Sequence, residues 1–261
     1  MIKAAFFDID GTLLSFETHL MPESTKRALI ALRKAGVLLF VATGRPSYQF
    51  PPCIAHGFGG FSGFDGFVSM SGSVCFDDGG IFFDCPLDER DVATVVRQVD
   101  EGRYDAMAMQ ADRAYCNELS PEILRISRQA NVEYEQGDIH DALSNRVYQF
   151  CAFLPPERED EVSSALTGAF TTRWNDLFCD IVPSQSSKPR GVEATLAHHG
   201  LTRDQAIAFG DGGNDETMLE YCGIGVAMGN AKQGTKDAAD YVTTSVDDDG
   251  IWNACKHFDL V

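Results

Sequence analysis

The feature that most constrains the fold is a pair of short apolar runs, separated by a helical stretch and each ending in polar residues. The first run, residues 2–7, ends in two aspartates, Asp8 and Asp10, and the second run covers residues 37–42. Short apolar runs of this kind predict strands that are buried on both faces of a parallel sheet. A helix is expected between them over residues 22–35, with a proline in its first turn and a glycine after its last. Alternation of strand, helix and strand predicts right-handed crossovers.

The rest of the chain divides by pattern into a continuation of this fold and an insertion. Strands are expected at residues 66–70, 74–76 and 81–83, with the last two forming a hairpin around Asp77-Asp78-Gly79-Gly80. After a helix at residues 87–99, strand-like runs follow at residues 106–110, 147–153, 170–174 and 178–182. The first pattern resumes near residue 188, with a helix at 191–198, a strand at 206–209 and a helix at 216–221. The Gly/Phe-rich segment 56–67 is interpreted as a surface loop.

These patterns predict an α/β fold with two domains. A Rossmann-like, parallel-sheet core domain with helices on both faces would comprise residues 1–84 and 185–261. Residues 85–184 would form an inserted α+β domain.

Charge and composition exclude several classes of function. The chain has 261 residues, of which 44% are hydrophobic, so a sizeable core is available. The formal net charge is −18 and the pI is about 4.6, with no dense run of Lys or Arg. A nucleic-acid partner is therefore not expected, and small substrates are favoured. An anionic substrate would need a site made locally positive by basic side chains, backbone amides or a metal ion.

The cysteines and the hydropathy pattern indicate a reducing, cytoplasmic setting. No two of the eight cysteines form a C-x-x-C pair, which argues against a zinc ribbon and a disulfide scaffold. They are interpreted as small buried hydrophobic residues. No apolar run approaches the roughly 20 residues that a membrane-spanning helix needs, and the N-terminus enters a strand without a charged leader. No membrane partner is expected.

Asp8 and Asp10 are candidate catalytic or metal-binding residues. They lie two positions apart at the end of a buried strand, where open α/β sheets bind their ligands, and ideal alternation would place both on one face. Two carboxylates so close repel each other unless a cation lies between them or one holds a proton. A hard divalent ion such as Mg²⁺ suits these oxygen ligands. The alternative interpretation is an acidic turn.

Three further segments carry polar residues next to predicted elements. Thr43-Gly44-Arg45 offers a hydroxyl, a close backbone approach and a guanidinium, all suited to phosphate, although Thr43 could instead cap a helix. The loop from Gly210 to Asp215 adds two carboxylates and an amide, or alternatively a capped helix start with Asn214 or Asp215 as the cap. Lys188 precedes a helix and could neutralise charge at a nucleophile, or could be a solvated surface lysine.

Together, in this order, these segments resemble the four motifs of the haloacid-dehalogenase-like phosphatases, over nearly the whole chain. D-x-D-G-T corresponds to Asp8 to Thr12, the Thr after an apolar strand to Thr43, the basic residue to Lys188, and G-D-G-x-N-D to Gly210 to Asp215. The A-T-G-R sequence ending at Arg45, the long insertion and the run Val226-Ala227-Met228-Gly229-Asn230-Ala231 resemble the Cof-type sugar-phosphatase branch. That branch carries an α/β cap, which would be the inserted domain.

The resemblance implies a mechanism and a set of site residues. Asp8 would attack phosphorus to form an aspartyl-phosphate, and Asp10 would protonate the leaving alcohol and then activate water. Mg²⁺ would be held by the Asp8 carboxylate, the Asp10 carbonyl and Asp211, with Asp215 in or near its coordination shell. The phosphoryl oxygens would be held by Thr43, the amide of Gly44, Lys188 and Asn214. Arg45 is a further phosphate candidate because of its guanidinium.

The sequence departs from the pattern of the family at two places. Ser71-Gly72-Ser73 stands where the branch often has Asn-Gly-Ala, so a polar contact made by Asn is in question. Family members often place Lys directly before Gly, whereas this chain has Lys188-Pro189-Arg190-Gly191. We assign the third motif to Lys188, which leaves Arg190 to face solvent or the cap.

Other polar residues received weaker assignments. In the cap, the residues considered for contact with the leaving group are Tyr115, Trp174, Asn175 and Asp180. The six histidines show no metal-ligand spacing, and the adjacent His198 and His199 are interpreted as partners of a helix C-terminal dipole.

The sequence thus favours a Mg²⁺-dependent phosphatase acting on a small phosphate ester, such as a sugar or polyol phosphate, with the cap excluding bulk water. One alternative is a phosphomutase, in which the phosphoryl group of the aspartyl-phosphate returns to the sugar. Another is a sugar-phosphate-binding regulatory protein without turnover. The oligomeric state is not predicted, and a monomer is compatible with the sequence.

Overall fold

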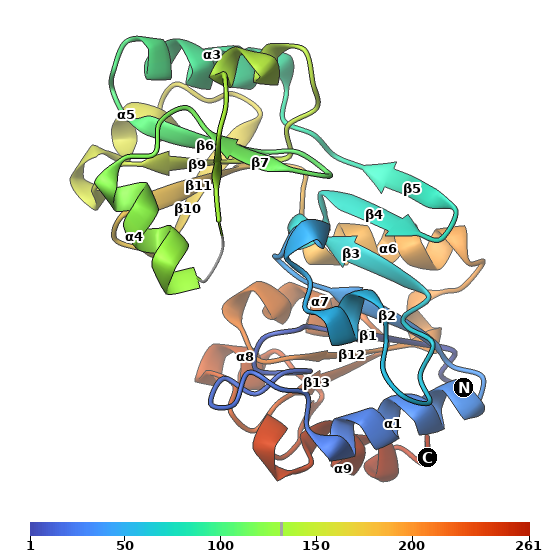
Figure 1. Ribbon diagram of the computed structural model, residues 1–261. Helices are drawn as coiled ribbons and strands as arrows, with labels where there is room; N and C mark the ends of the chain where they lie inside the picture. The colour runs from blue at the N-terminus through green and yellow to red at the C-terminus, as the bar shows by residue number, and fades with distance from the viewer. Residues whose placement is uncertain (131–132) are drawn as a thin grey trace. The chain divides into compact units, whose positions relative to one another are not determined.

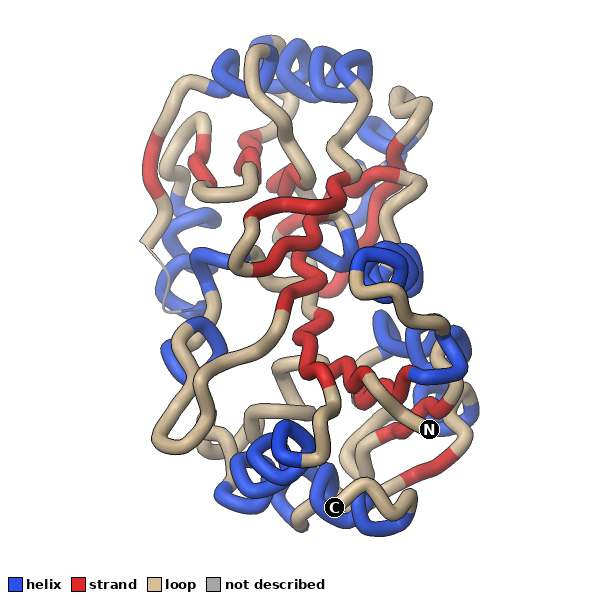
Figure 2. The backbone as a smooth tube through the Cα atoms, turned by 90° about the vertical axis from the view of Figure 1, so that its right-hand side faces the viewer, coloured by secondary structure: helices blue, strands red, loops and turns tan. Residues whose placement is uncertain are grey.

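The computed structural model describes the backbone of residues 1–130 and 133–261, and all their side chains except those at positions 126, 129, 130, 174 and 175. The chain forms two compact units. The core unit comprises Met1–Arg45, Phe50–Asp84 and Ser187–Val261, and the cap unit comprises Pro46–Gln49 and Cys85–Ser186. The cap unit therefore ends at Ser186 where the sequence suggested residue 184, and it includes the short segment Pro46–Gln49. Both chain termini belong to the core unit, and Figure 2 marks them as N and C.

The core unit is built on one eight-stranded sheet, which confirms the predicted α/β fold class. Its strand order is β14-β13-β12-β1-β2-β3-β4-β5, parallel from β14 to β3 and antiparallel from there to β5. The parallel strands are β1 (Ala4–Phe7), β2 (Leu38–Ala42), β3 (Gly66–Ser69), β12 (Ala206–Gly210), β13 (Ile224–Ala227) and β14 (Tyr241–Val242). The edge hairpin is formed by β4 (Val74–Asp77) and β5 (Gly80–Asp84), as the sequence predicted.

Helices cover both faces of this sheet because successive strand side chains point to opposite sides. Phe7 and its neighbours pack with α1 (Glu23–Lys34) and α9 (Gly250–His257). Phe6 belongs to the opposite cluster, with α6 (Lys188–His198) and α7 (Glu216–Tyr221). Figure 1 shows α1 and α9 on one side of the core sheet and α6 and α7 on the other. The shorter helices are α2 (Pro52–Ala55) and α8 (Gln233–Asp237).

Helix α6 begins earlier than the sequence suggested. It starts at Lys188, and the Ser187 side chain accepts a hydrogen bond from the Arg190 amide at 3.4 Å, as an N-cap does. Pro189 is tolerated because the first turn does not need its amide as a donor. Lys188 is thus fixed in a helical first turn and does not lie in a loop before the helix.

The segment of residues 56–67 is a loop up to the start of β3, as expected, but it is also anchored to the core by aromatic rings. Phe58, Phe61, Phe64 and Phe67 form a chain of neighbouring rings with centroids 5.0, 5.2 and 6.2 Å apart. Phe61 is only 4% exposed, and the other three rings pack against the same core cluster as α1. Aromatic burial therefore holds this segment on the domain.

The cap unit contains a six-stranded sheet in the order β10-β11-β9-β6-β7-β8, antiparallel except for the β7–β8 pair. Its strands are β6 (Asp105–Met109), β7 (Ala114–Cys116), β8 (Glu135–Gln136), β9 (Gln149–Phe153), β10 (Ala169–Asn175) and β11 (Phe178–Pro183). Its helices are α3 (Glu89–Asp100), α4 (Pro121–Ala130) and α5 (Asp160–Ser163). Valines on one face of α3 pack with Phe150 of β9 in a separate hydrophobic core, and Figure 1 shows α3 lying along this sheet.

Two sequence expectations concern the whole chain. All eight cysteines are free, and six of them are buried, as expected of small hydrophobic residues. Of the helices in the described ranges, none has the length and apolar character that crossing a membrane requires.

Candidate active site

The centre of the candidate site is an ammonium group between two carboxylates. Asp8 follows β1 directly, and its amide donates to the Phe209 carbonyl at 3.0 Å, which keeps it in line with the sheet. The Nζ atom of Lys188 donates to Oδ1 of Asp8 at 2.6 Å and to Oδ1 of Asp215 at 2.5 Å. Lys188 is 2% exposed, so its interpretation as a solvated surface lysine is wrong.

The late loop is held in shape by Asp215. Oδ2 of Asp215 accepts hydrogen bonds from the amides of Asp211 at 3.0 Å and Gly212 at 2.9 Å. Asp215 is fully buried, and its other oxygen faces Lys188. The Asp215 carboxylate therefore both orders the loop backbone and binds Lys188. The alternative role from the sequence, a helix cap, would not account for the contact with Lys188.

Asp211 is held by Thr12, near the start of the chain, and by Asn230. Thr12 Oγ1 donates to Oδ1 of Asp211 at 3.0 Å. Asn230 Nδ2 donates to the Gly11 carbonyl at 2.8 Å and lies 3.4 Å from Oδ2 of Asp211. Gly11 has a φ of +82°, and a β-carbon there would collide with the Asp211 carboxylate. The turn after β1 thus requires glycine both for its conformation and for the close approach of this carboxylate.

Asp8, Asp211 and Asp215 each place one carboxylate oxygen within 4.8 Å of the other two. Burial, together with the charges of the neighbouring aspartates, raises the pKa of Asp8 to about 8 and the pKa of Asp211 to about 6. Burial opposes the charged form of Lys188, but the two facing carboxylates outweigh this effect and raise its pKa. Three buried carboxylates around one ammonium leave negative charge uncompensated. Hard oxygen donors in this arrangement fit a divalent cation such as Mg²⁺.

Arg45 binds Asp10 in a two-pronged ion pair. Its Nε donates to Oδ2 of Asp10 and its Nη2 to Oδ1, both at 2.7 Å. Both side chains are partly exposed, at 37% and 38%. The sequence assigned Arg45 to phosphate, whereas the structure directs its guanidinium to the predicted acid/base. Its phosphate contact stays a prediction.

Strand β2 is followed by a residue with a hydroxyl group, Thr43, and then by an exposed glycine, Gly44. Thr43 is 2% exposed, and its Oγ1 accepts a hydrogen bond from the Arg45 amide at 3.1 Å. The Thr43 amide donates to the Val68 carbonyl of β3 at 2.8 Å. Gly44, the next residue, is exposed. The assignment of both residues to phosphate stays a prediction.

The loop after β3 has an unusual backbone that explains one departure from the family pattern. Met70, Ser71 and Gly72 all have positive φ, at 50°, 54° and 94°. Asn tolerates this left-handed region better than Ser, which gives a conformational reason for Asn at the position of Ser71. A β-carbon on Gly72 would collide with the carbonyl oxygen of Ser187, so the loop presses against the residue that precedes Lys188.

The remaining predicted residues lie in the late loop, in α6 and in the cap unit. Asn214 is exposed in the same loop as Asp211, and the guanidinium of Arg190 lies 5.6 Å from the centre of the Phe83 ring. In the cap unit, Tyr115 is 2% exposed and Asp180 accepts a hydrogen bond from the Cys151 thiol at 3.0 Å. The side chains of Trp174 and Asn175 are outside the described part of the chain.

The sequence interpretation missed three supporting residues. Thr12 and Asn230 both fall in segments that carried the family resemblance, but neither was given a role. Gly72 was noted only as part of a divergent tripeptide. In each case the missing information was a partner that lies 115 or more positions away in the chain, such as Asp211 for Thr12.

Known proteins and solved structures resemble this chain over nearly its whole length. The family model of haloacid dehalogenase-like hydrolases matches residues 5–255. The chain is 31% identical to the putative phosphatase YkrA of Bacillus subtilis (strain 168), over 99% of this chain and 98% of that protein. It is 32% identical to a solved structure of the HAD subclass IIB sugar phosphatase BT4131, with a TM-score of 0.86 and coverage of 99% and 100%. It is 31% identical to BT1666 from Bacteroides thetaiotaomicron, described as a phosphatase of the same superfamily, with a TM-score of 0.88 and coverage of 100% and 96%.

The chain belongs to the haloacid dehalogenase-like hydrolase family. The predicted resemblance to its Cof-type phosphatases and the predicted enzyme class, a phosphatase, are confirmed.

Proposed function

We propose that this phosphatase hydrolyses small sugar or polyol phosphate monoesters, that it requires Mg²⁺, and that it forms an aspartyl-phosphate on Asp8. The observation that carries the proposal is the contact of Lys188 with both Asp8 and Asp215, with Asp211 beside them, at the carboxyl ends of two neighbouring parallel strands. Such strand ends are where open α/β sheets bind ligands. A nucleophile, a fixed positive charge and a set of oxygen donors for a cation meet there.

In the first step, a carboxylate oxygen of Asp8 attacks phosphorus and the bond from phosphorus to the alcohol oxygen breaks. Lys188 keeps Asp8 in place and supplies positive charge near the phosphoryl oxygens, where phosphoryl transfer is most helped by electrostatic stabilisation. Mg²⁺, held by the carboxylates of Asp8 and Asp211 with Asp215 close by, would supply further neutralisation of the phosphoryl charge. The Thr43 hydroxyl, the Gly44 amide and Asn214 would bind the remaining oxygens.

Asp10 would act as acid and then as base. Its proton passes to the leaving alkoxide, giving the free alcohol. It then takes a proton from the water that attacks phosphorus, and the bond from phosphorus to Asp8 breaks, releasing inorganic phosphate. Arg45 holds both oxygens of Asp10 before substrate binds, so the guanidinium orients the carboxylate and must yield one oxygen when Asp10 accepts a proton.

A sugar or polyol phosphate is supported by the similarity to a protein described as a sugar phosphatase over 99% of this chain. The net charge of −18 agrees with a small anionic substrate, which is attracted by positive charge only once it is inside the site. A long polyanion would be repelled outside it.

Replacing Asp8 tests the proposal. In the Asp8→Asn variant, Mg²⁺-dependent phosphate release from a panel of hexose, pentitol and aryl phosphates should fall at least about 10³-fold while the circular dichroism spectrum is unchanged. Asp204→Asn is the matched control, because Asp204 is exposed just before β12 begins, at the other end of that strand from Asp211. Retained activity in Asp8→Asn would refute the mechanism.

Product analysis separates the alternatives. One mole of inorganic phosphate per mole of alcohol supports a hydrolase. An isomerised sugar phosphate without phosphate release would point to a phosphomutase. Tight binding of a phosphate ester that the wild-type protein leaves intact would point to a regulatory binding protein.

A further inference from the structure

We propose that Asp77, His198 and His199 form a second metal site, which takes a zinc-like transition-metal ion and is separate from the carboxylate centre at Asp8. The inference is independent of the proposed substrate and mechanism. It concerns the opposite end of helix α6, where that helix meets the β4–β5 hairpin.

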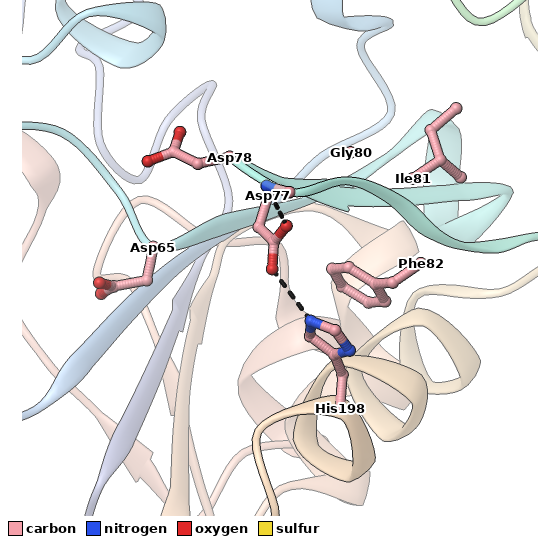
Figure 3. Close-up of a pocket in the computed structure, with 8 residues that line it drawn as sticks. Asp65, Asp77, Asp78, Gly80, Ile81, Phe82 and His198 are labelled. Atoms are coloured by element: carbon pink, nitrogen blue, oxygen red, sulfur yellow. Dashed lines mark hydrogen bonds and ion pairs between the residues drawn. The ribbon is translucent and has the colours of Figure 1, made fainter.

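The three side chains come together from segments that are distant in the sequence. Asp77 is the last residue of β4, and the two histidines lie at the C-terminal end of α6. One carboxylate oxygen and one ring nitrogen from each histidine lie within 4.8 Å of one another. Nε2 of His198 is 3.0 Å from Oδ2 of Asp77, and Figure 3 shows this imidazole directed at the carboxylate. Sequence spacing alone could not reveal the group, because its carboxylate lies 121 positions from His198.

The ligand groups are already held in position by their neighbours. Oδ1 of Asp77 accepts a hydrogen bond from the Gly79 amide at 2.8 Å, which leaves Oδ2 for His198 or a metal ion. The His198 ring stacks on Phe82 with centroids 4.2 Å apart, and the His199 ring lies 5.0 Å from that of Phe40. Supporting contacts that fix a carboxylate or an imidazole are a general feature of metal sites.

His199 supplies a second, independent observation. Its Nε2 is enclosed and has no hydrogen-bond partner among the residues that the structure describes. A buried polar nitrogen without a partner is unfavourable, so this imidazole has a binding capacity that its surroundings do not use.

The donor set selects the class of ion. Two imidazole nitrogens and one carboxylate oxygen are typical of zinc and other first-row transition metals, whereas Mg²⁺ and Ca²⁺ prefer oxygen ligands. Bonds of about 2.0–2.1 Å in a tetrahedral site place neighbouring ligand atoms about 3.3 Å apart, close to the 3.0 Å between Asp77 and His198. His198 has 42% of its side chain exposed and can adjust to complete the geometry.

The site opens into a cavity that leaves room for the remaining ligands. The cavity has a volume of about 310 Å³ and is lined in part by Asp65, Asp77, Asp78, Phe82 and His198 (Figure 3). The Asp65 carboxylate is occupied by the Arg33 guanidinium and the Leu39 amide, so it offers no free ligand. Water would complete the coordination from the cavity.

Zinc titration in excess Mg²⁺ tests the proposal, since Mg²⁺ occupies sites made only of oxygen ligands. Isothermal titration calorimetry of the wild-type chain should show one Zn²⁺ site, and Co²⁺ should give visible absorption bands of nitrogen and oxygen coordination. We expect His198→Gln and Asp77→Asn each to raise the dissociation constant for Zn²⁺ at least about tenfold. Asp77→Asn keeps an oxygen for the Gly79 amide, so it tests the site even if His198→Gln perturbs the fold.

His257→Gln is the matched control. His257 is also an exposed histidine in the last turn of a helix, and it stacks on Tyr241 with ring centroids 4.0 Å apart, but it has no part in the cluster. Unchanged Zn²⁺ affinity in this variant, with loss in the other two, supports the site. Absence of Zn²⁺ binding, or equal binding by wild type and His198→Gln, would show that the Asp77–His198 contact is only a hydrogen bond.

Discussion

The two ends of helix α6 make similar contacts in very different surroundings. At the N-terminal end, Lys188 has 1% of its side chain exposed and binds two carboxylates, Asp8 and Asp215. At the C-terminal end, His198 binds Asp77, but 42% of its side chain is exposed. One helix thus carries a buried ammonium group at its start and a partly solvated imidazole at its end.

The difference teaches how burial decides what an ion pair does. Removing one member of a buried pair leaves a charge without compensation in a medium of low polarity, which costs several kcal/mol. An exposed pair contributes at most about 1 kcal/mol because water screens it. The buried end is therefore suited to holding a fixed charge beside a nucleophile, and the exposed end to exchanging its partner for a metal ion.

The largest expected effect follows from removing the buried cation. Lys188→Met keeps the volume but leaves Asp8 and Asp215 facing each other without a counterion. We expect a loss of about 3–5 kcal/mol in the free energy of unfolding and a fall in kcat of at least about 10²–10³-fold. Urea denaturation and steady-state kinetics measure the two.

Arg190→Met is the control for that variant. Arg190 lies two positions further along, over the Phe83 ring, and competes with Lys188 for the third motif. Its replacement should change kcat by less than about threefold. A larger loss in Arg190→Met than in Lys188→Met would overturn our assignment.

The second effect concerns the loop that presses on the start of α6. Gly72→Ala places a side chain at a position with positive φ, where it collides with the Ser187 carbonyl. We therefore expect the free energy of unfolding to fall by about 1–3 kcal/mol, and kcat to fall markedly because Lys188 shifts. Gly36→Ala has a similar φ of +81° but meets nothing within 4 Å. This variant should lower the free energy of unfolding by about 1 kcal/mol and leave kcat unchanged. Equal kcat values in the two variants would show that the loop does not position Lys188.

The third effect is the pH dependence of the buried end without metal. The pKa of Asp8 is raised from 3.8 to about 8, so the folded state binds more protons than the unfolded state between these values. The stabilising effect of the protonated form is therefore complete near pH 4 and is lost as the pH rises to about 8. In EDTA, the Tm of the wild type should fall relative to that of Asp8→Asn over this range.

Adding Mg²⁺ should reverse the fall, and more at pH 8 than at pH 5, because the ion binds the ionised carboxylates. Parallel Tm curves for wild type and Asp8→Asn in EDTA would show that Asp8 does not carry the pH dependence.

The smallest effect is expected at the exposed end. Without transition metal, His198→Gln should lower the free energy of unfolding by less than about 1 kcal/mol, a Tm change of at most about 2–4 °C, and leave kcat unchanged. Thermal melts in a chelating buffer measure the shift. A loss of unfolding free energy as large as that of Lys188→Met would show that the two ends of the helix do not differ in this way.

Much of the core fold could be predicted because its signals are local. The apolar runs before Asp8 and Thr43 predicted β1 and β2, and the Asp-Gly turn predicted the β4–β5 hairpin. The start of α6 and the packing of the phenylalanines around Phe61 on the core were missed. Local pattern alone favoured a loop at both places, and packing in the folded chain decided otherwise.

The sequence by itself determined the family and the acidic and basic residues that could meet, because each motif is a contiguous run whose chemistry is fixed by residue type. Only the tertiary structure decided the partners. It directed Arg45 to Asp10, enclosed Lys188 between Asp8 and Asp215, and brought Asp77 to two histidines at the far end of α6. Hydrogen bonds and ion pairs act over a few ångströms of space, while these partners are separated by 27 to 180 positions in the chain.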